Sequence, residues 1–237
     1  MNKELKSVPF VFKNESTESE HKMTLSGTVG QDSWWSDEKR INSKNIREAL
    51  DDVTVPITIY LNSPGGDVFE GIEIYNYLKN HEQEVTIEVT GLAASAASVI
   101  AMGADKVVMN TGTSLMVHEA STFTWGNKGD IQKTLNALET IDNSLVDIYV
   151  EKTEKSTDDI NSWLTSEKWF TADEAVENGL ADEIKKKVNE DEIDVVALVN
   201  NSVAEAMKKF SASSENVKPE TGPKNKLLMN LQKLGGK

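Results

Sequence analysis

The sequence predicts an α/β domain built around a largely parallel, helix-covered sheet. A strand, a glycine-rich turn and a helix follow one another over residues 55–79, and a strand and an alanine-rich helix follow over residues 85–104. Repeated units of this kind, joined by right-handed crossovers, give a parallel sheet whose ligands bind beyond the carboxyl ends of its strands. Apolar residues at helical spacing over residues 130–152 add one long helix.

Composition narrows the class of protein. The 237 residues, 38% of them hydrophobic, suffice for one large core with tails. A formal net charge of −14 argues against nucleic acid as a partner, because affinity for phosphates rests on Lys and Arg. No stretch approaches the roughly 18 to 20 apolar residues of a membrane span, so we expect a cytoplasmic protein with no membrane association. The absence of cysteine excludes thiolate chemistry and cysteine-ligated metal, and we expect no metal and no cofactor.

The N-terminal part begins with a polar extension, residues 1–22, in which Val8–Phe12 has the character of a short edge strand. Met23–Gly30 then predicts the first strand of the core. Beyond it, the adjacent Trp34 and Trp35 lie in a polar connection, where paired aromatic rings indicate docking onto the core or a subunit.

The next unit contains a glycine-rich turn. Ser43 is expected to cap a helix that ends near Leu50, and residues 55–61 read as a strand. After the turn at residues 62–67, apolar residues recur at helical spacing: Val68, Ile72, Tyr75 and Leu78. Glycines let a backbone N–H approach a ligand closely, as oxyanion holes and phosphate cradles require, although a tight connecting turn needs them equally. A phosphate loop of the G-x-x-x-x-G-K type is absent.

The central unit places a serine where a strand meets a helix. Residues 85–90 alternate as a strand, and Ala93–Ala104 is rich in helix-forming alanine, which puts Ser95 in the first turn of the predicted helix. Unpaired N–H groups and the positive end of the helix dipole would stabilise an anion there. A packing helix of small residues explains the same pattern, and the G-x-S-x-G motif is absent.

The sequence contains three histidines as candidate bases. His118 follows the predicted strand at residues 114–117, so it lies beyond a strand end, as do Ser95 and the glycine turn. His21 and His81 lie in charged stretches and are expected at the surface.

Further along, Thr171 and Glu174 form a capping box that opens a short helix closed by Gly179. From residue 200 the composition turns polar, which is typical of disorder.

Three motifs, NSPGGDVFEGIEIY, GLAASAAS and LMVHEAS, occur in this order, followed by FTADEAVENGLAD. Together they resemble the Clp protease proteolytic subunit family, most closely its phage head-maturation (prohead) protease branch. The resemblance implies a ClpP/crotonase-like fold of repeated ββα units with a long protruding handle helix. It divides the chain into the extension at residues 1–22, a protease domain at residues 23–185 and a mostly disordered tail at residues 186–237.

The resemblance also assigns roles. Ser95 is the nucleophile, His118 the general base, and the backbone N–H groups of Gly66 and Ala96 form the oxyanion hole. A substrate fixed by backbone pairing would lie as an extended strand along segments that follow these residues: Asp67 and Val68 on one side, and Glu119, Ala120 and Ser121 on the other.

The third member of the triad departs from the family pattern. The family carries an aspartate two residues before the phenylalanine of the F-x-A-x-E-A block, where this chain has Lys168. Lysine cannot accept an imidazole N–H. We expect Glu167 to take this role; the Asp158–Asp159 pair, or a backbone carbonyl that leaves a dyad, are the alternatives.

These expectations combine into a serine endopeptidase that processes phage capsid or scaffold proteins. The resemblance also implies that the chain assembles into a homo-oligomeric ring, for example a heptamer or stacked rings. It leaves open whether an ATPase unfoldase is needed. Two alternatives remain, a crotonase-fold enzyme acting on acyl-CoA thioesters and a noncatalytic structural ring. The thioester enzyme would use paired amides at the same place but would not need Ser95 and His118 as a pair.

Overall fold

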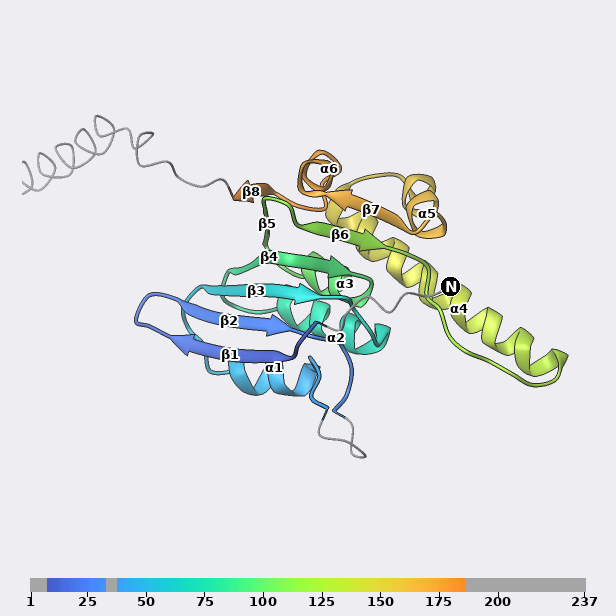
Figure 1. The fold of residues 1–237 in the computed structure, drawn as a ribbon, viewed down its shortest axis with the longest axis horizontal. Helices are drawn as coiled ribbons and strands as arrows, with labels where there is room; N and C mark the ends of the chain where they lie inside the picture. Colours follow the sequence, from blue (N-terminus) through green and yellow to red (C-terminus); the bar gives the residue numbers. More distant parts are fainter. Residues whose placement is uncertain (1–7, 33–37, 186–237) are drawn as a thin grey trace, which may run out of the picture. The chain divides into compact units, whose positions relative to one another are not determined.

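The computed structural model describes residues 8–32 and 38–185. Within these residues, an eight-stranded sheet is accompanied by six helices (Figure 1). The strands are β1 Val11–Ser16, β2 His21–Ser26, β3 Ile57–Ser63, β4 Val85–Ala94, β5 Lys106–Asn110, β6 Ser114–Val117, β7 Lys168–Thr171 and β8 Glu183–Lys185. The helices are α1 Ser43–Leu50, α2 Val68–Lys79, α3 Ala96–Met102, α4 Lys128–Thr153, α5 Thr157–Thr165 and α6 Ala172–Glu177.

The predicted α/β class and the largely parallel sheet are confirmed. The strand order is β1-β2-β3-β4-β5-β8, and every neighbouring pair from β2 to β8 is parallel. Antiparallel pairing joins the edge strand β1 to β2, and β7 to β6. The predicted first core strand, Met23–Gly30, is β2 at His21–Ser26, which begins and ends earlier in the chain than predicted.

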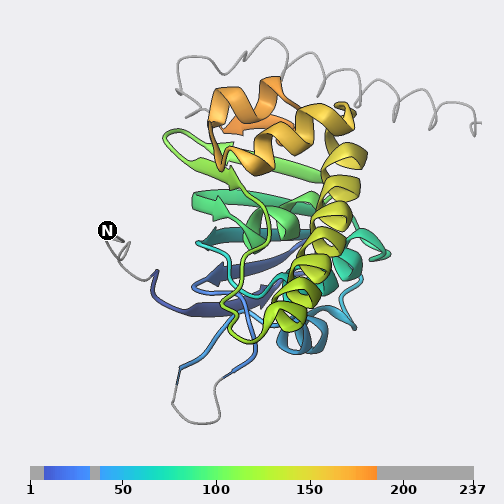
Figure 2. The ribbon, with the colours of Figure 1, turned by 90° about the vertical axis from the view of Figure 1, so that its right-hand side faces the viewer.

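The two faces of the sheet differ. Helices α1 to α4 lie on one side of it, as two perpendicular views show (Figures 1 and 2). Along β3, Ile57, Ile59 and Leu61 are buried and alternate with half-buried Thr58 and Tyr60. This alternation belongs to a sheet with one packed face, so the predicted helix cover is present on a single face.

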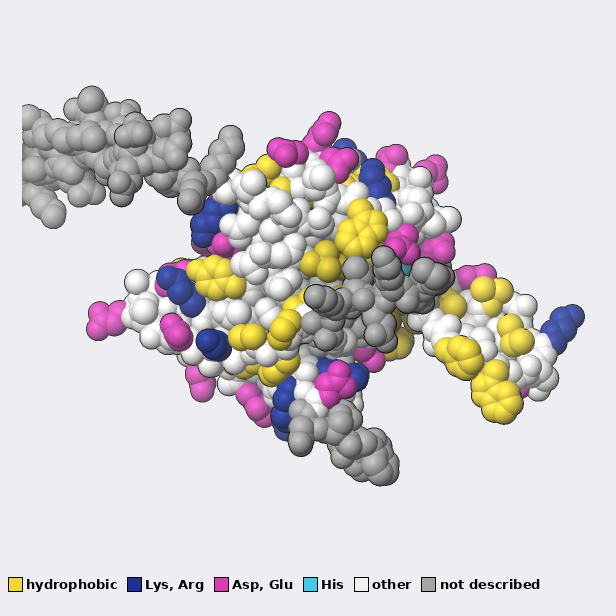
Figure 3. Space-filling model, viewed as in Figure 1, with side chains coloured by type: hydrophobic (Ala, Val, Ile, Leu, Met, Phe, Trp, Pro, Cys, Tyr) yellow, Lys and Arg dark blue, Asp and Glu magenta, His cyan; other side chains and the backbone are white. Residues whose placement is uncertain are grey.

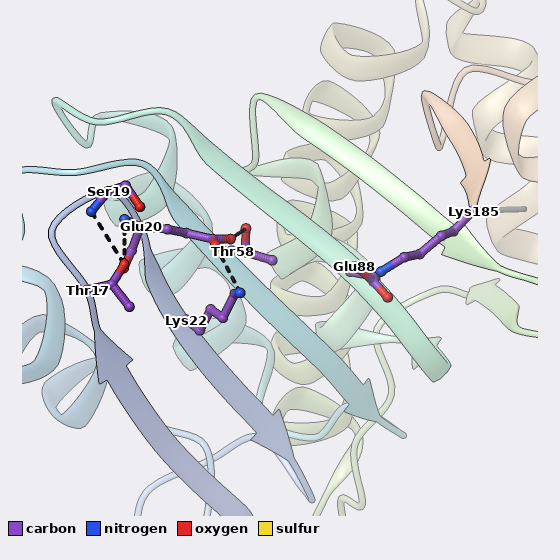
Figure 4. Close-up of polar contacts among 7 residues, drawn as sticks. All are labelled: Thr17, Ser19, Glu20, Lys22, Thr58, Glu88 and Lys185. Carbon is purple, nitrogen blue, oxygen red and sulfur yellow. Dashed lines mark hydrogen bonds and ion pairs between the residues drawn. The ribbon is translucent and has the colours of Figure 1, made fainter. Parts of the chain in front are cut away.

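The uncovered face carries paired charges (Figure 4). Glu20 accepts a hydrogen bond from Thr58 at 2.8 Å and pairs with Lys22 at 3.0 Å. Further along the sheet, the Glu88 carboxylate lies 2.7 Å from the Lys185 ammonium group.

The start of the described chain joins the sheet instead of standing apart from it. β1 pairs with β2 along its whole length, from Val11 opposite Ser26 to Ser16 opposite His21, so the expected edge strand lies a few residues later than Val8–Phe12. The prediction that His21 is solvated is wrong: its side chain is 3% exposed. His21 shares the inward face of β2 with Met23 and Leu25, a period-two pattern that the sequence already contains.

Local details of the helices correct one prediction and confirm another. Asn42, not Ser43, caps α1, because its extended backbone lets its side chain accept the N–H of Asn45. The capping box of Thr171 and Glu174 at the start of α6 is present as predicted. Trp34, Trp35 and the tail at residues 186–237 lie outside the described residues.

Helix α4 is the long predicted helix. It has 26 residues and projects from the sheet at its N-terminal end (Figure 1). Its last turns are packed against the core through Leu145, Val146, Ile148 and Tyr149. Over its outer part and the loop before it, hydrophobic side chains gather at the surface (Figure 3): Phe123, Trp125, Ile131 and Leu135.

In the described ranges, no helix combines the length and the hydropathy that crossing a bilayer requires.

Candidate active site

Strand β4 positions the site by changing its partner. Over Thr86–Val89 it pairs with β5, and over Leu92–Ala94 it pairs in parallel with β6. Parallel strands end at the same edge, so the residues that follow β4 and β6 come together there. The Ser95 N–H extends the ladder by donating to the Met116 carbonyl at 2.9 Å, and His118 follows β6 directly.

The turn at Ser95 differs from the predicted first helical turn. β4 continues to Ala94 and α3 begins at Ala96, while Ser95 itself has φ 56° and ψ −127°. A residue with a side chain adopts such a backbone only under constraint from its surroundings, and strained serines at strand-to-helix turns present their hydroxyl outward. Here the constraint is hydrogen bonding at both ends, since the Ser95 carbonyl accepts from the N–H and the hydroxyl of Ser98.

The hydroxyl of Ser95 and the imidazole of His118 are hydrogen-bonded. Ser95 Oγ lies 2.8 Å from His118 Nε2, and both residues are half-buried. A serine that donates to Nε2 requires the neutral ring to carry its proton on Nδ1. An imidazole in this position can remove the hydroxyl proton, which is what makes a serine nucleophilic.

The glycine turn lies against the serine turn. A Cβ on Gly65 would come within 2.5 Å of the Ala94 carbonyl oxygen and 2.7 Å of Ser95 Cβ, so only glycine permits this approach. At Gly66 a Cβ would meet the Val29 carbonyl oxygen at 2.0 Å, and its φ is 150°. Among the described residues nothing accepts a hydrogen bond from the Gly66 N–H, and the Ala96 N–H opens α3, where helix geometry provides no acceptor. Two unpaired amides therefore come from the segments that flank the hydroxyl.

The predicted third member is not joined to the base. Glu167 lies exposed in the turn between α5 and β7, at φ 49°, and within the described residues no hydrogen bond or ion pair links it to His118. Asp158 and Asp159 lie in the first turn of α5, where Asp159 accepts the Ser156 hydroxyl at 2.6 Å.

Lys168, at the family's aspartate position, has a packing role. Its ammonium group lies 5.0 Å from the ring centre of Trp163 and 4.7 Å from that of Phe170. Both are cation–π distances, so its charge faces aromatic rings.

Helix α4 contributes residues that the sequence reasoning missed. The Tyr149 hydroxyl lies 2.7 Å from Ser98 Oγ, which in turn donates to the Ser95 carbonyl at 2.7 Å. Burial raises the pKa of Tyr149, so its hydroxyl stays protonated. Asp142 accepts the backbone N–H of Ala120 at 2.7 Å. Neither contact has a sequence signature, because 51 and 22 residues separate the partners.

A cavity of about 400 Å³ opens over the serine and the histidine. All the residues predicted to contact substrate line it, together with one face of α4: Gly66, Asp67, Val68, Phe69, Ser95, Ala96, Val99, His118, Glu119, Ala120, Ser121, Thr122, Thr134, Ala137, Leu138, Ile141, Leu145 and Tyr149. The α4 face of the cavity is mostly apolar, whereas Asp67, Glu119, Ser121 and Thr122 lie beside the serine–histidine pair. An apolar wall next to a few polar groups suits a peptide with apolar side chains.

The other histidines lie elsewhere. His21 Nδ1 is 2.6 Å from the Ser16 hydroxyl, and burial lowers the pKa of His21. His81 is half-buried, with Nε2 3.2 Å from the Leu50 carbonyl oxygen. Across the described ranges, no cluster of three or more His, Cys, Asp or Glu side chains has the arrangement of a metal site.

Comparisons with known proteins all identify the same family. The profile of the family described as Clp protease matches residues 44–188. An ATP-dependent Clp protease proteolytic subunit of Bacteroides fragilis is 33% identical over 132 residues, which cover 54% of this chain and 63% of that protein. The ATP-dependent Clp protease proteolytic subunit 1 of Salinibacter ruber is 30% identical over 138 residues, 57% of this chain and 59% of that protein. The corresponding subunit 1 of Protochlamydia amoebophila is 33% identical over 139 residues, 57% of this chain and 68% of that protein. The chain thus spans less than two thirds of the length of the first two of these relatives.

Proposed function

This chain belongs to the Clp protease family, and from that premise we propose that it is a serine endopeptidase with Ser95 as nucleophile and His118 as general base. The observation that carries the proposal is the 2.8 Å hydrogen bond between Ser95 Oγ and His118 Nε2, made from a strained turn at the floor of the cavity. We assign this activity to residues 23–185.

The reaction follows from these groups. His118 Nε2 takes the hydroxyl proton as Ser95 Oγ attacks the peptide carbonyl, and the negative oxygen that forms is held by the N–H groups of Gly66 and Ala96. His118 then returns the proton to the leaving amine, which leaves an ester on Ser95. Water, deprotonated by the same imidazole, hydrolyses that ester and restores the free hydroxyl.

Substrate binds as an extended strand between Asp67–Val68 and Glu119–Ser121. On the second segment, the N–H groups of Glu119 and Ala120 already donate to the Leu164 carbonyl and to Asp142. The peptide must therefore pair with the carbonyls of this segment and with the Ser121 N–H. A peptidyl inhibitor complex without main-chain hydrogen bonds along both segments contradicts this arrangement.

We also propose a homo-oligomeric ring, built as a heptamer or as stacked rings. The support is the exposed apolar cluster of Phe123, Trp125, Ile131 and Leu135, because a projecting helix with large apolar side chains in water favours burial against another subunit. Replacing Leu135 with Asp should shift the native mass to smaller species, while Glu139→Asp, an exposed acidic position on the same helix, should not. A monomeric wild-type protein rejects the ring.

The physiological substrates we propose are capsid or scaffold proteins of a phage, in line with the sequence resemblance to head-maturation proteases. The relatives named above are ATP-dependent subunits, whereas an unfolded or flexible scaffold segment can enter the cavity without an unfoldase. Incubation of the purified protein with a scaffold precursor, with and without ATP, tests both parts. Cleavage that requires an added ATPase would assign the chain to the ATP-dependent type instead.

Labelling with a fluorophosphonate tests the central proposal. This reagent phosphonylates an activated serine, so the wild-type protein should take up one equivalent per chain and lose peptidase activity. The Ser95→Ala variant should take up none. An unlabelled wild-type protein that still cleaves an unstructured protein excludes Ser95 as the nucleophile, and an unlabelled, inactive protein supports a noncatalytic ring. Turnover of an acyl-CoA thioester that survives Ser95→Ala supports the crotonase-type alternative.

A further inference from the structure

The hydrogen bond with Ser95 holds the imidazole of His118 at one ring nitrogen only. Nε2 faces Ser95, and among the described residues no hydrogen bond reaches Nδ1. We propose that Asp142 of α4 is the positioning residue for His118, which fixes the ring and stabilises its protonated form during catalysis. This inference rests on the proposed peptidase function.

The backbone brings Asp142 to the base. Asp142 Oδ1 accepts the N–H of Ala120 at 2.7 Å, and Ala120 is two residues beyond His118. The carboxylate therefore holds the segment that carries the imidazole. Oδ2 takes part in no hydrogen bond within the described residues and is the atom available to the ring. On α4, the adjacent Ile141 lines the cavity together with Ser95 and His118.

The electrostatic environment fits a carboxylate with this role. Burial raises the pKa of Asp142, the hydrogen bond from Ala120 and the charge of His118 oppose that rise, and the charge of Glu119 adds to it. Asp142 thus gives up part of its hydration, and its charge acts on the base through space, because no hydrogen bond or ion pair joins the two side chains in the described structure. A carboxylate at an exposed helix position would keep its hydration, and burial would not raise its pKa.

The other charged groups near the base either have contacts elsewhere or face solvent. The Glu119 carboxylate accepts the Thr165 hydroxyl at 2.8 Å, which draws it toward α5. Lys168 of β7, which is opposite Val117 of β6, lies over aromatic rings. Glu167, the acid predicted from sequence register, is exposed and without a contact to the imidazole in the described structure. Asp142 differs from these groups because it holds, through the Ala120 N–H, the segment that carries the imidazole.

The substitution Asp142→Asn separates charge from structure. The asparagine oxygen can still accept the Ala120 N–H, so the segment stays held, but the negative charge beside the imidazole is lost. We expect kcat/KM for a peptide substrate to fall at least about a hundredfold, by analogy with losses of up to ~10⁴ when a triad carboxylate is amidated. Asp147→Asn, the same change at an exposed position five residues further along α4, is the matched control and should keep the wild-type rate.

Two further readouts distinguish positioning from packing. The acid limb of the kcat/KM profile should move to lower pH in Asp142→Asn, because the protonated base loses a neighbouring negative charge. Asp142→Glu restores the negative charge on a side chain that is one methylene longer. We expect its rate to exceed that of Asp142→Asn by tenfold or more. A packing role predicts neither effect.

The outcomes are distinct. A wild-type rate in Asp142→Asn overturns the inference. So does a hundredfold loss in Glu167→Gln with Asp142→Asn unaffected, which would restore the assignment made from sequence. Loss in both Asp142→Asn and Asp147→Asn assigns the effect to the helix and also overturns it. Failure of the peptidase proposal is recognised separately, because the wild-type protein would then take up no fluorophosphonate, or Ser95→Ala would retain labelling or activity.

Discussion

Strand β4 carries one polar site on the open face and leads into a second at its carboxyl end, and the two sites differ in how fully their polar groups are paired. Glu88, on the open face, is 9% exposed and has both oxygens occupied, one by Asn110 at 2.8 Å and one by Lys185 at 2.7 Å. Ser95, directly after the same strand, has a strained backbone, a single hydroxyl contact to His118 and unpaired amides beside it. Where all polar groups are paired, the contacts stabilise the fold; where the backbone is strained and donors stay unpaired, they remain available to a substrate.

The largest expected effect is the loss of activity in Ser95→Ala. We expect kcat/KM to fall by at least about 10⁴-fold, because removal of a serine nucleophile leaves only the contribution of binding and the oxyanion hole. The free energy of unfolding, measured by urea titration, should change by less than about 0.5 kcal/mol, since the hydroxyl is half-buried and has one partner. A large loss of stability would mean that the contacts of Ser95 stabilise the fold, as those of Glu88 do.

Ser98→Ala should show the reverse pattern. Its hydroxyl joins the buried Tyr149 to the Ser95 carbonyl, so its removal leaves the tyrosine hydroxyl without this partner. We expect the free energy of unfolding to fall by about 1–3 kcal/mol while kcat stays within about tenfold of wild type. Tyr149→Phe in the Ser98→Ala background should recover part of the stability. An inactive Ser98→Ala variant that no longer takes up fluorophosphonate would place the nucleophile at Ser98.

Glu88→Gln should cost stability alone. The amide can keep the bond with Asn110 but loses the ion pair with Lys185, and we expect about 1 kcal/mol in urea unfolding. Peptidase activity should be unchanged. Glu183→Gln, which removes the exposed 3.0 Å pair with Lys106, is the control and should cost less than about 0.5 kcal/mol. Equal costs at both positions would show that burial of Glu88 adds nothing.

The smallest expected effect is a pH dependence on the open face. The hydrogen bond with Glu88 raises the pKa of Lys185 above its ordinary value. A raised lysine pKa in the folded state stabilises the fold at every pH below the ordinary value of about 10.4, and this stabilisation disappears as the pH rises through the folded value. The stability difference between wild type and Lys185→Met should therefore be constant from pH 7 to 9 and shrink above about pH 10.5. A difference that shrinks already near pH 7 contradicts this origin.

Several features could be predicted from local sequence because short-range contacts fix them. The strands at Ile57–Ser63 and Ser114–Val117, the long helix and the capping box of Thr171 depend on side-chain alternation, helical spacing and contacts within four residues. The order of strands and turns also predicted that Ser95, the glycine turn and His118 lie at one edge of the sheet. Parallel strands bring such residues together irrespective of the side chains between them.

What the tertiary structure decided involves backbone strain or residues far apart in the chain. Helix propensity placed Ser95 inside a helix, whereas the ladder bond to Met116 extends β4 and holds the serine at positive φ. His21 is buried because its face of β2 meets the core. The contacts of Asp142 with Ala120 and of Tyr149 with Ser98 arise only when α4 packs across the sheet. Propensity and periodicity describe a residue's neighbours within a few positions, and the free energy of packing distant segments can override them or add contacts that no local pattern contains.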